Sequence, residues 1–401
     1  MVTANQRDRL FGAMVAVVAE RGYDATRVAD VSKLSGVSRS AFYELFDDKL
    51  DCFLATVDAI VDSATESVAA AYGMDGGWED RLRAALDTLV ELVVAQPAAA
   101  RLCLVETHAA GPEAVERVQR RARALGRLAS AALRDSPERA GMPPEVVRAV
   151  LGGTLKVVET RVRLGHQREL PALVPQLLEW ALSYRTPPEQ LKPPSRRPAM
   201  PAAAAAARED AARERILRAM TELVAEKGYP SATVSEVSRR AAVSLTTFYA
   251  IFDGKEQAFL AALDDTTTRL LAATLPAYRA ATDWPHAVHD GLGAFLAYLS
   301  SETAAARLAG HAAWAAGPAA MEHVDKGLHS FEALLVNGSR RRPTPEITAE
   351  AVGGSISSLI YDQLRREQAE RLYLLTPTAT FVALAPYIGT IEACAIASGA
   401  G

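Results

Sequence analysis

The sequence predicts an all-α protein built from two tandem helical units. Apolar residues recur at three- and four-residue intervals along much of the 401-residue chain, and no segment shows the sustained alternation of a half-buried strand. One phrase also occurs twice, as GVSRSAFYELFDDK at 36–49 and as AVSLTTFYAIFDGK at 242–255, with seven of fourteen positions identical. The chain therefore carries the same kind of domain twice.

The repeat extends well beyond this phrase. Matches continue at a constant offset of 206 from residue 13 to residue 118 and include the AAGP sequences at 109–112 and 315–318. Later the offset becomes about 201, where VLGGTLKVV at 150–158 matches AVGGSISSL at 351–359. A repeat of this length indicates a duplicated domain and not a solenoid unit.

Each copy begins with an amphipathic helix that should end at a glycine, Gly22 or Gly228. In copy two the next helix opens with Thr233 and Glu236, which have the spacing of a capping box. In copy one, Thr26 or Arg27 takes that place.

A short turn and a third helix follow. Ser38 and Ser244 are expected to cap this third helix, which should end near Phe46 or Phe252. Four phenylalanines are expected to anchor it in the core: Phe42, Phe46, Phe248 and Phe252. Copy two has Ala242 where copy one has Gly36, and an alanine costs about 1 kcal/mol if the turn requires a positive φ.

The rest of each copy is also predicted to be helical, with periodic segments at 78–95, 101–109, 113–134 and 143–165. Between the copies, the proline-rich start of 185–210 favours extended chain and indicates a semi-rigid spacer. Copy one is expected to consist of a three-helix domain at 1–54 and a larger helical domain at 55–186. A linker at 187–207 follows, and copy two repeats the two domains at 208–260 and 261–401.

Helix, short turn and serine-capped helix form the helix-turn-helix pattern. The stretch G-Y-x-A-T-x-V-x-D-V-x-x-x-x-G-V-S-x-x-x-F-Y-x-x-F-x-x-K at 22–49 closely resembles the N-terminal DNA-binding domain of the TetR repressor family, and 228–255 resembles it too. The resemblance implies ligand-binding and dimerisation helices downstream, with double-stranded DNA and a small-molecule effector as partners. Family proteins usually bind DNA as two-fold dimers, so this chain is expected to form an intramolecular pseudo-dimer.

Base reading is expected from the first turn of the third helix. The residues there are Arg39, Ser40 and Ala41 in copy one and Leu245, Thr246 and Thr247 in copy two. Arginine can pair bidentately with guanine, whereas Leu245 offers only apolar contact, for example to a thymine methyl group. The operator should therefore be an imperfect palindrome. Further DNA contacts are expected at Thr26, Ser38, Thr233 and Ser244.

Two pairs of residues leave alternatives open. The resemblance implies that the hydroxyl groups of Tyr43 and Tyr249 contact DNA phosphate, although an amphipathic tyrosine can also close the core. Lys49 and Lys255 come just before another helix, whose N-terminal N–H groups also attract phosphate. These lysines are expected to bind DNA phosphate, and the alternative is that they are ordinary solvated lysines.

Copy two also carries aromatic residues where copy one is aliphatic. Leu89, Leu92, Val105 and His108 correspond to Phe295, Tyr298, His311 and Trp314. Apolar walls with a few polar groups are typical of small-molecule pockets, so these four residues of copy two are candidate ligand contacts, with core filling as the alternative. The Gly152-Gly153 and Gly353-Gly354 pairs either allow helices of the two copies to approach closely or are merely tolerated.

Composition limits the function. The three cysteines lie far apart, and the sequence has neither a signal-like N-terminus nor an eighteen-residue apolar run. A cytoplasmic protein without a metal or cofactor is expected, and no phosphate loop or nucleophile–base motif suggests an enzyme. The expected function is a DNA-binding transcriptional regulator, a repressor, under small-molecule control. The alternative is a helical ligand-binding or scaffold protein of the same fold that has lost operator binding.

Overall fold

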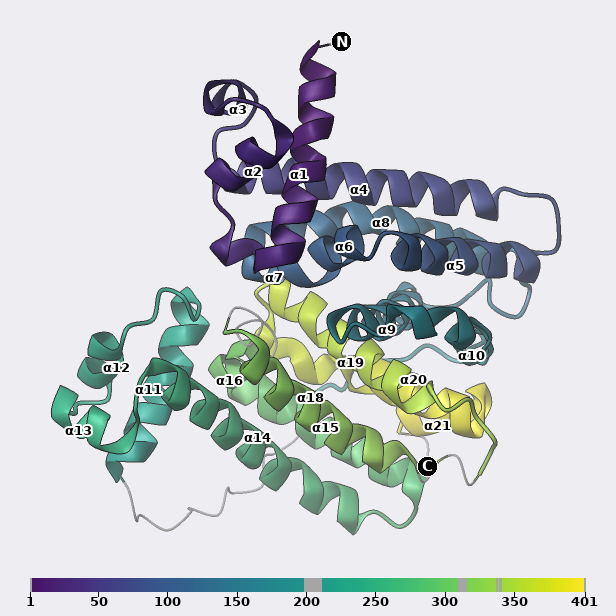
Figure 1. Ribbon diagram of the computed structural model, residues 1–401. Helices are drawn as coiled ribbons and strands as arrows, with labels where there is room; N and C mark the ends of the chain where they lie inside the picture. The colour runs from purple at the N-terminus through teal and green to yellow at the C-terminus, as the bar shows by residue number, and fades with distance from the viewer. Residues whose placement is uncertain (1, 198–210, 309–315, 337, 339–340, 400–401) are drawn as a thin grey trace. The chain divides into compact units, whose positions relative to one another are not determined.

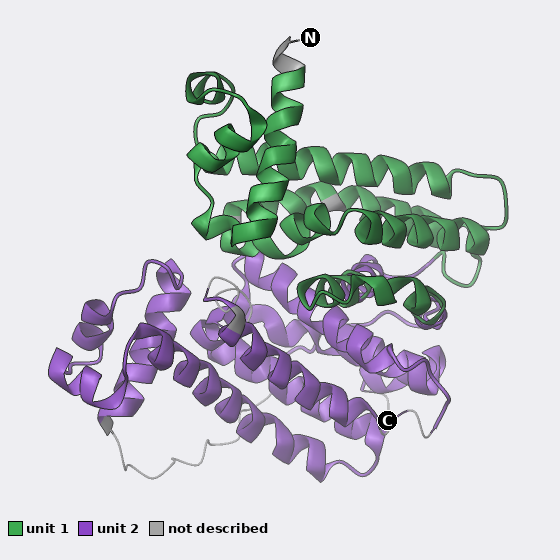
Figure 2. Cartoon of the chain, in the orientation of Figure 1, with its two compact units in different colours: residues 1–140, 154–178 green, residues 141–153, 179–401 purple. Residues whose placement is uncertain are grey.

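The computed structural model describes residues 2–197, 211–308, 316–336, 338 and 341–399. Within these ranges the chain forms helices and connecting segments without a strand, which confirms the all-α prediction (Figure 1). The chain divides into two compact units (Figure 2). Unit 1 comprises residues 1–140 and 154–178, and unit 2 comprises residues 141–153 and 179–401.

Unit 1 opens with the three helices of the predicted helix-turn-helix and continues with long regulatory helices. Its elements are α1 (Val2–Ala25), α2 (Val28–Ser35), α3 (Arg39–Leu45), α4 (Lys49–Tyr72), α5 (Trp78–Ala95), α6 (Pro97–Arg101), the π-helical turn η1 (Leu102–Glu106), α7 (Thr107–Ala109) and α8 (Pro112–Arg134). Then follow α9 (Pro144–Arg163), the 3₁₀ turn η2 (Gln167–Glu169) and α10 (Leu170–Leu182), of which α9 and α10 contribute to both units.

Two apolar clusters hold unit 1 together. The helix-turn-helix core joins α1 to α4 and includes Leu10, Met14, Val31, Phe42 and Phe53, all fully buried. The regulatory core lies among α5, α9 and α10 and consists of Val90, Val93, Val158, Val162, Leu170, Val174 and Leu178. Burial of such aliphatic and aromatic side chains stabilises each cluster by about 1.5–3 kcal/mol per residue.

In unit 2, the helices of copy two follow in the same order as those of copy one. Its helices are α11 (Ala211–Lys227), α12 (Val234–Arg240), α13 (Leu245–Ile251), α14 (Lys255–Ala280), α15 (Trp284–Ser301), α16 (Thr303–Arg307), α18 (Pro318–Leu335), α19 (Thr348–Arg365), the 3₁₀ turn η5 (Ala369–Leu375), α20 (Thr376–Ile388) and α21 (Thr390–Ala397). The part of the linker at 185–197 is irregular chain without a helix, as its prolines predict.

Helix α9 and helix α19 approach closely inside unit 2. A Cβ atom on Gly152 would overlap the side chain of Ser358, and one on Gly153 would overlap the carbonyl oxygen of Ala351. This confirms the predicted close approach for the first glycine pair. Gly353 does not face copy one, because a Cβ atom added to it would lie 2.8 Å from Leu328, which is also in copy two. Its near neighbour is thus α18 and not a helix of copy one.

The described residues contain no single helix that is both long and apolar enough to cross a membrane. The segments Trp78–Ala95 and Pro97–Ala109 are long and apolar enough only when they are taken together, and a bend of 102° separates them.

Candidate nucleic-acid interface

The turn between the second and third helix has a residue with positive φ at the same position in both copies. Gly36 has φ 63° and Ala242 has φ 53°, so both lie in the left-handed region. Alanine there is strained, as the sequence suggested. An arginine of the first helix supports each turn, since Arg9 donates to Ser35 O and Arg215 Nε donates to Ala241 O at 2.9 Å.

The third helices, α3 and α13, are capped and anchored as predicted. Ser38 Oγ accepts from Ala41 N at 3.1 Å, and Ser244 Oγ accepts from Thr247 N at 2.9 Å. Each cap satisfies one of the N–H groups that a helix start leaves open. The four expected phenylalanines, Phe42, Phe46, Phe248 and Phe252, are all buried, so one face of each short helix is fixed in the core.

The opposite face leaves the first helical turn open to solvent. Arg39 and Ser40 are exposed in copy one, and Leu245 and Thr246 are exposed in copy two. Leu245 is a large apolar side chain that remains 48 % exposed. The residues after them, Ala41 and Thr247, are half-buried. These first turns therefore present unlike side chains on the same local backbone.

The tyrosines of the motif lie at the surface. Tyr43 is 57 % exposed and Tyr249 is 56 % exposed. Each ring meets the preceding phenylalanine edge-on, with centroids 5.4 Å apart for Phe42 and 5.5 Å for Phe248. Each ring packs against the edge of the core but remains more than half exposed. This exposure favours contact with DNA phosphate over closure of the core as the interpretation of these side chains.

The lysines of the motif bind the turn that ends the first helix. Lys49 Nζ donates to Tyr23 O at 2.9 Å and lies 4.0 Å from the centre of the Tyr23 ring. Lys255 repeats both contacts with Tyr229, at 3.1 Å and 4.2 Å. Burial lowers the pKa of both lysines. This structural role was not predicted from the sequence, although both copies have the same Tyr-to-Lys separation. Phosphate binding by their remaining N–H donors stays a prediction.

Two threonines, Thr26 and Thr233, were also expected to contact DNA, and the structure places them differently. Thr26 is 2 % exposed and its hydroxyl donates to Gly22 O at 2.7 Å, so its side chain has no surface to offer to DNA. The expectation that Thr26 contacts DNA is wrong for this reason. Thr233 is exposed and caps α12 by accepting from Glu236 N at 3.3 Å. The glutamate does not complete the reciprocal box, because it accepts from the Thr233 hydroxyl and pairs with Lys227.

Comparison with known proteins agrees with this geometry. The family model "Bacterial regulatory proteins, tetR family" matches the chain twice, over residues 12–56 and 216–262. Each copy thus contains a segment that matches the tetR family model. The two matched segments cover the helix-turn-helix of each copy and the start of the helix that follows.

Two curated regulators are among the proteins that this chain resembles. The HTH-type transcriptional activator FasR of Mycolicibacterium smegmatis is 26 % identical over 114 residues, which are 28 % of this chain and 52 % of FasR. The HTH-type transcriptional regulator CymR of Pseudomonas putida is 30 % identical over 112 residues, 28 % of this chain and 55 % of CymR. The chain thus spans about half the length of these relatives.

Solved structures of two regulators align with less than half of the chain. FadR from Bacillus subtilis, solved in complex with stearoyl-CoA, is 18 % identical and covers 44 % of this chain and 97 % of its own, with a TM-score of 0.41. The fatty acid degradation regulator FadR from Bacillus halodurans is 19 % identical, with coverages of 44 % and 97 % and a TM-score of 0.40.

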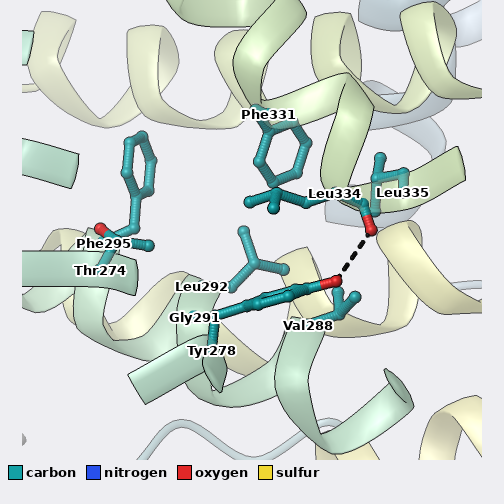
Figure 3. Close-up of a pocket in the computed structure, with 9 residues that line it drawn as sticks. All are labelled: Thr274, Tyr278, Val288, Gly291, Leu292, Phe295, Phe331, Leu334 and Leu335. Atoms are coloured by element: carbon teal, nitrogen blue, oxygen red, sulfur yellow. Dashed lines mark hydrogen bonds between the residues drawn. The ribbon is translucent and has the colours of Figure 1, made fainter. Parts of the chain in front are cut away.

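In the regulatory half of copy two, α14, α15 and α18 line a cavity of about 30 Å³ (Figure 3). Phe295 and Phe331 line it with Tyr278, whose hydroxyl donates to Leu334 O at 3.1 Å. Gly291 makes room for the Tyr278 ring, since a Cβ atom there would lie 3.3 Å from it. The cavity has room for about one water molecule.

The four candidate ligand residues have different positions. Phe295 lines the cavity, whereas Tyr298 is buried outside the lining, and burial raises its pKa to about 12. His311 and Trp314 lie outside the described residues. Phe331 was not predicted from the sequence, although the offset of 206 aligns it with Leu125 and thus indicates another aliphatic-to-aromatic change between the copies.

Proposed function

We propose that the chain is a sequence-specific DNA-binding transcriptional regulator whose two recognition helices read two different half-sites. The observation that carries this proposal is the pair of serine-capped helices, α3 and α13, with exposed first turns of unlike composition. Phosphate contacts give affinity without sequence information, while side chains in the major groove discriminate between bases. Arg39 and Leu245 would then prefer different bases.

We further propose that the two halves form an intramolecular pseudo-dimer. Support comes from unit 2, where residues of copy one pack among the helices of copy two. Gly152 and Gly153 lie against α19, and the Tyr184 hydroxyl donates to Val382 O at 2.8 Å. Tyr184 is fully buried there, as expected for a permanent contact.

Binding to fragments of the genome that encodes the protein, measured by fluorescence anisotropy at several salt concentrations, tests the proposal. Affinity should fall with salt because bound phosphates release counterions. Arg39→Ala should weaken binding to the preferred fragment about 10- to 100-fold, as expected for loss of a bidentate base contact. Lys33→Ala is the matched control, since Lys33 is an exposed cation on α2. Equal losses in both variants would contradict base reading by Arg39.

We also propose that copy two holds the effector site, in an enlarged form of the cavity beside Phe295. Small-molecule sites usually measure about 300–1,000 Å³, so a ligand has to separate α15 from α18. An effector acts only if it binds the DNA-competent and incompetent states unequally. The relatives are named as regulators, and we propose no enzymatic activity for the chain.

A ligand panel screened by thermal shift tests the effector site. Phe295→Ala should change the affinity of any ligand found, whereas Tyr298→Phe should not, because Tyr298 does not line the cavity. The reverse pattern would place the site elsewhere. Repression stays a prediction, and a reporter gene with the selected operator across its promoter decides between repression and activation.

A further inference from the structure

Glu106 of copy one connects the regulatory helices to the helix-turn-helix. Its carboxylate is buried, with the side chain 9 % exposed. One oxygen, Oε2, accepts from the backbone N–H of Tyr23 at 3.0 Å. The other, Oε1, lies 3.2 Å from Arg101 Nε. A buried carboxylate is stable only when it is paired in this way.

The N–H of Tyr23 needs this acceptor because the first helix breaks just before it. Gly22 has φ 76° and ψ 165°, which is not helical, so the amide that follows has left the helical hydrogen-bond ladder. The carbonyl of the same residue accepts from Lys49 at the start of α4. Tyr23 therefore has its N–H held from the regulatory side and its carbonyl held from the helix that follows the recognition helix.

The turn that carries Glu106 enters both cores of unit 1. Glu106 ends η1, a five-residue π-helical turn, and such wide turns occur frequently at functional sites. Leu102 and Cys103 of this turn belong to the helix-turn-helix core, while Leu104 and Val105 pack against the regulatory core. The segment that binds Tyr23 is therefore in direct contact with the regulatory core as well as with the helix-turn-helix core.

Copy two lacks the carboxylate. Position 312, which corresponds to Glu106, is alanine in the sequence. Tyr229 keeps the lysine contact to its carbonyl and the ring contact to Phe259, with ring centroids 4.7 Å apart. Among the residues that the structure describes, its N–H has no acceptor.

We propose that Glu106 is a positioning residue that couples the regulatory core of copy one to its recognition helix, and that the two DNA-binding heads respond unequally because copy two has alanine at the corresponding position 312. This inference deepens the proposed function and rests on it for its biological meaning. The coupling itself is a property of the protein without DNA, so it can fail or hold independently of operator binding.

Hydrogen–deuterium exchange of the Tyr23 amide in the full chain, resolved to single residues and measured without DNA, tests the bond. Glu106→Ala should accelerate this exchange at least about tenfold, because a hydrogen bond to a charged group is lost. Glu106→Gln should retain most of the protection, since its amide oxygen still accepts. The Tyr229 amide is the internal control and should not change. Unchanged exchange of Tyr23 in Glu106→Ala, or equal loss in both variants, would overturn the assignment.

A double-mutant cycle tests the coupling. Val90→Ala loosens the regulatory core at a residue that is 1 % exposed. It should accelerate exchange of Tyr23 when Glu106 is present and should add little in the Glu106→Ala background. Additive effects of the two substitutions would show that the regulatory core does not act through Glu106, and the proposal would then be wrong.

Discussion

At the scale of single residues, Lys49 and Lys255 bind carbonyl groups that lie 26 residues earlier in the chain. A lysine placed over a tyrosine ring and against a carbonyl oxygen stabilises the fold through a cation–π contact and a charge-assisted hydrogen bond. Both copies keep this arrangement although their recognition residues differ. The lysine thus belongs to the scaffold that positions the recognition helix, whatever else its remaining donors contact.

Lys49→Ala should lower the free energy of unfolding of unit 1 by about 1–2 kcal/mol, because both contacts are lost together. Urea denaturation of the full chain measures this change. Lys33→Ala removes an exposed charge from the same domain and should have an effect within about 0.5 kcal/mol. If the two variants unfold alike, the scaffold role of Lys49 is wrong.

At the scale of elements, both helix-turn-helix turns need a residue in the left-handed conformation, and this residue is glycine in copy one and alanine in copy two. In copy one a Cβ on Gly36 would overlap the guanidinium of Arg9. Copy two carries Ala242 at this position, and its equivalent arginine, Arg215, donates through Nε to Ala241 O. Copy two has therefore accommodated the methyl group, and the conformational cost of φ 53° remains.

Ala242→Gly should stabilise the helix-turn-helix of copy two, by at most about 1 kcal/mol, because glycine adopts this conformation without a steric penalty but loses more chain entropy on folding. Thermal unfolding of the full chain provides the measurement. Gly36→Ala is the matched reverse change and should destabilise copy one, since the new methyl group meets Arg9. Stabilisation by both substitutions would contradict the strain argument.

The elements that could be predicted from sequence are those fixed by neighbouring residues. Serine caps, turn glycines and buried phenylalanines act within a few positions, so the α3 and α13 helices and their exposed turns followed from local chemistry. Glu106 lies 83 residues from Tyr23, and the cavity beside Phe295 depends on three separate helices. Such contacts leave no local pattern. The burial of Thr26 likewise depends on how the first helix breaks at Gly22.

At the scale of the whole molecule, the two copies must act together within one chain if they are to read one operator. The contact of α9 with α19 is tight because glycine places backbone against backbone. Any side chain at Gly153 meets the carbonyl oxygen of Ala351, which cannot rotate away.

Gly153→Val should therefore destabilise unit 2 by about 1–3 kcal/mol through overpacking. Gly327→Ala is the control, because a Cβ on Gly327 of α18 meets nothing within 4 Å. That substitution should be neutral or slightly stabilising in a helix. Differential scanning calorimetry compares the two, and a Gly153→Val protein as stable as the wild type would remove the support for tight pairing.

Selection of binding sites from random double-stranded DNA by the full chain tests the central claim most directly. A homodimer presents identical side chains to both half-sites and selects a symmetric operator. This chain presents Arg39 with Ser40 on one recognition helix and Leu245 with Thr246 on the other. We predict an operator with two unlike halves, one with a required guanine and one less discriminating and tolerant of thymine, and Arg39→Ala should relax only the first half. A symmetric consensus with equal information in both halves, or no enriched site, would contradict the account.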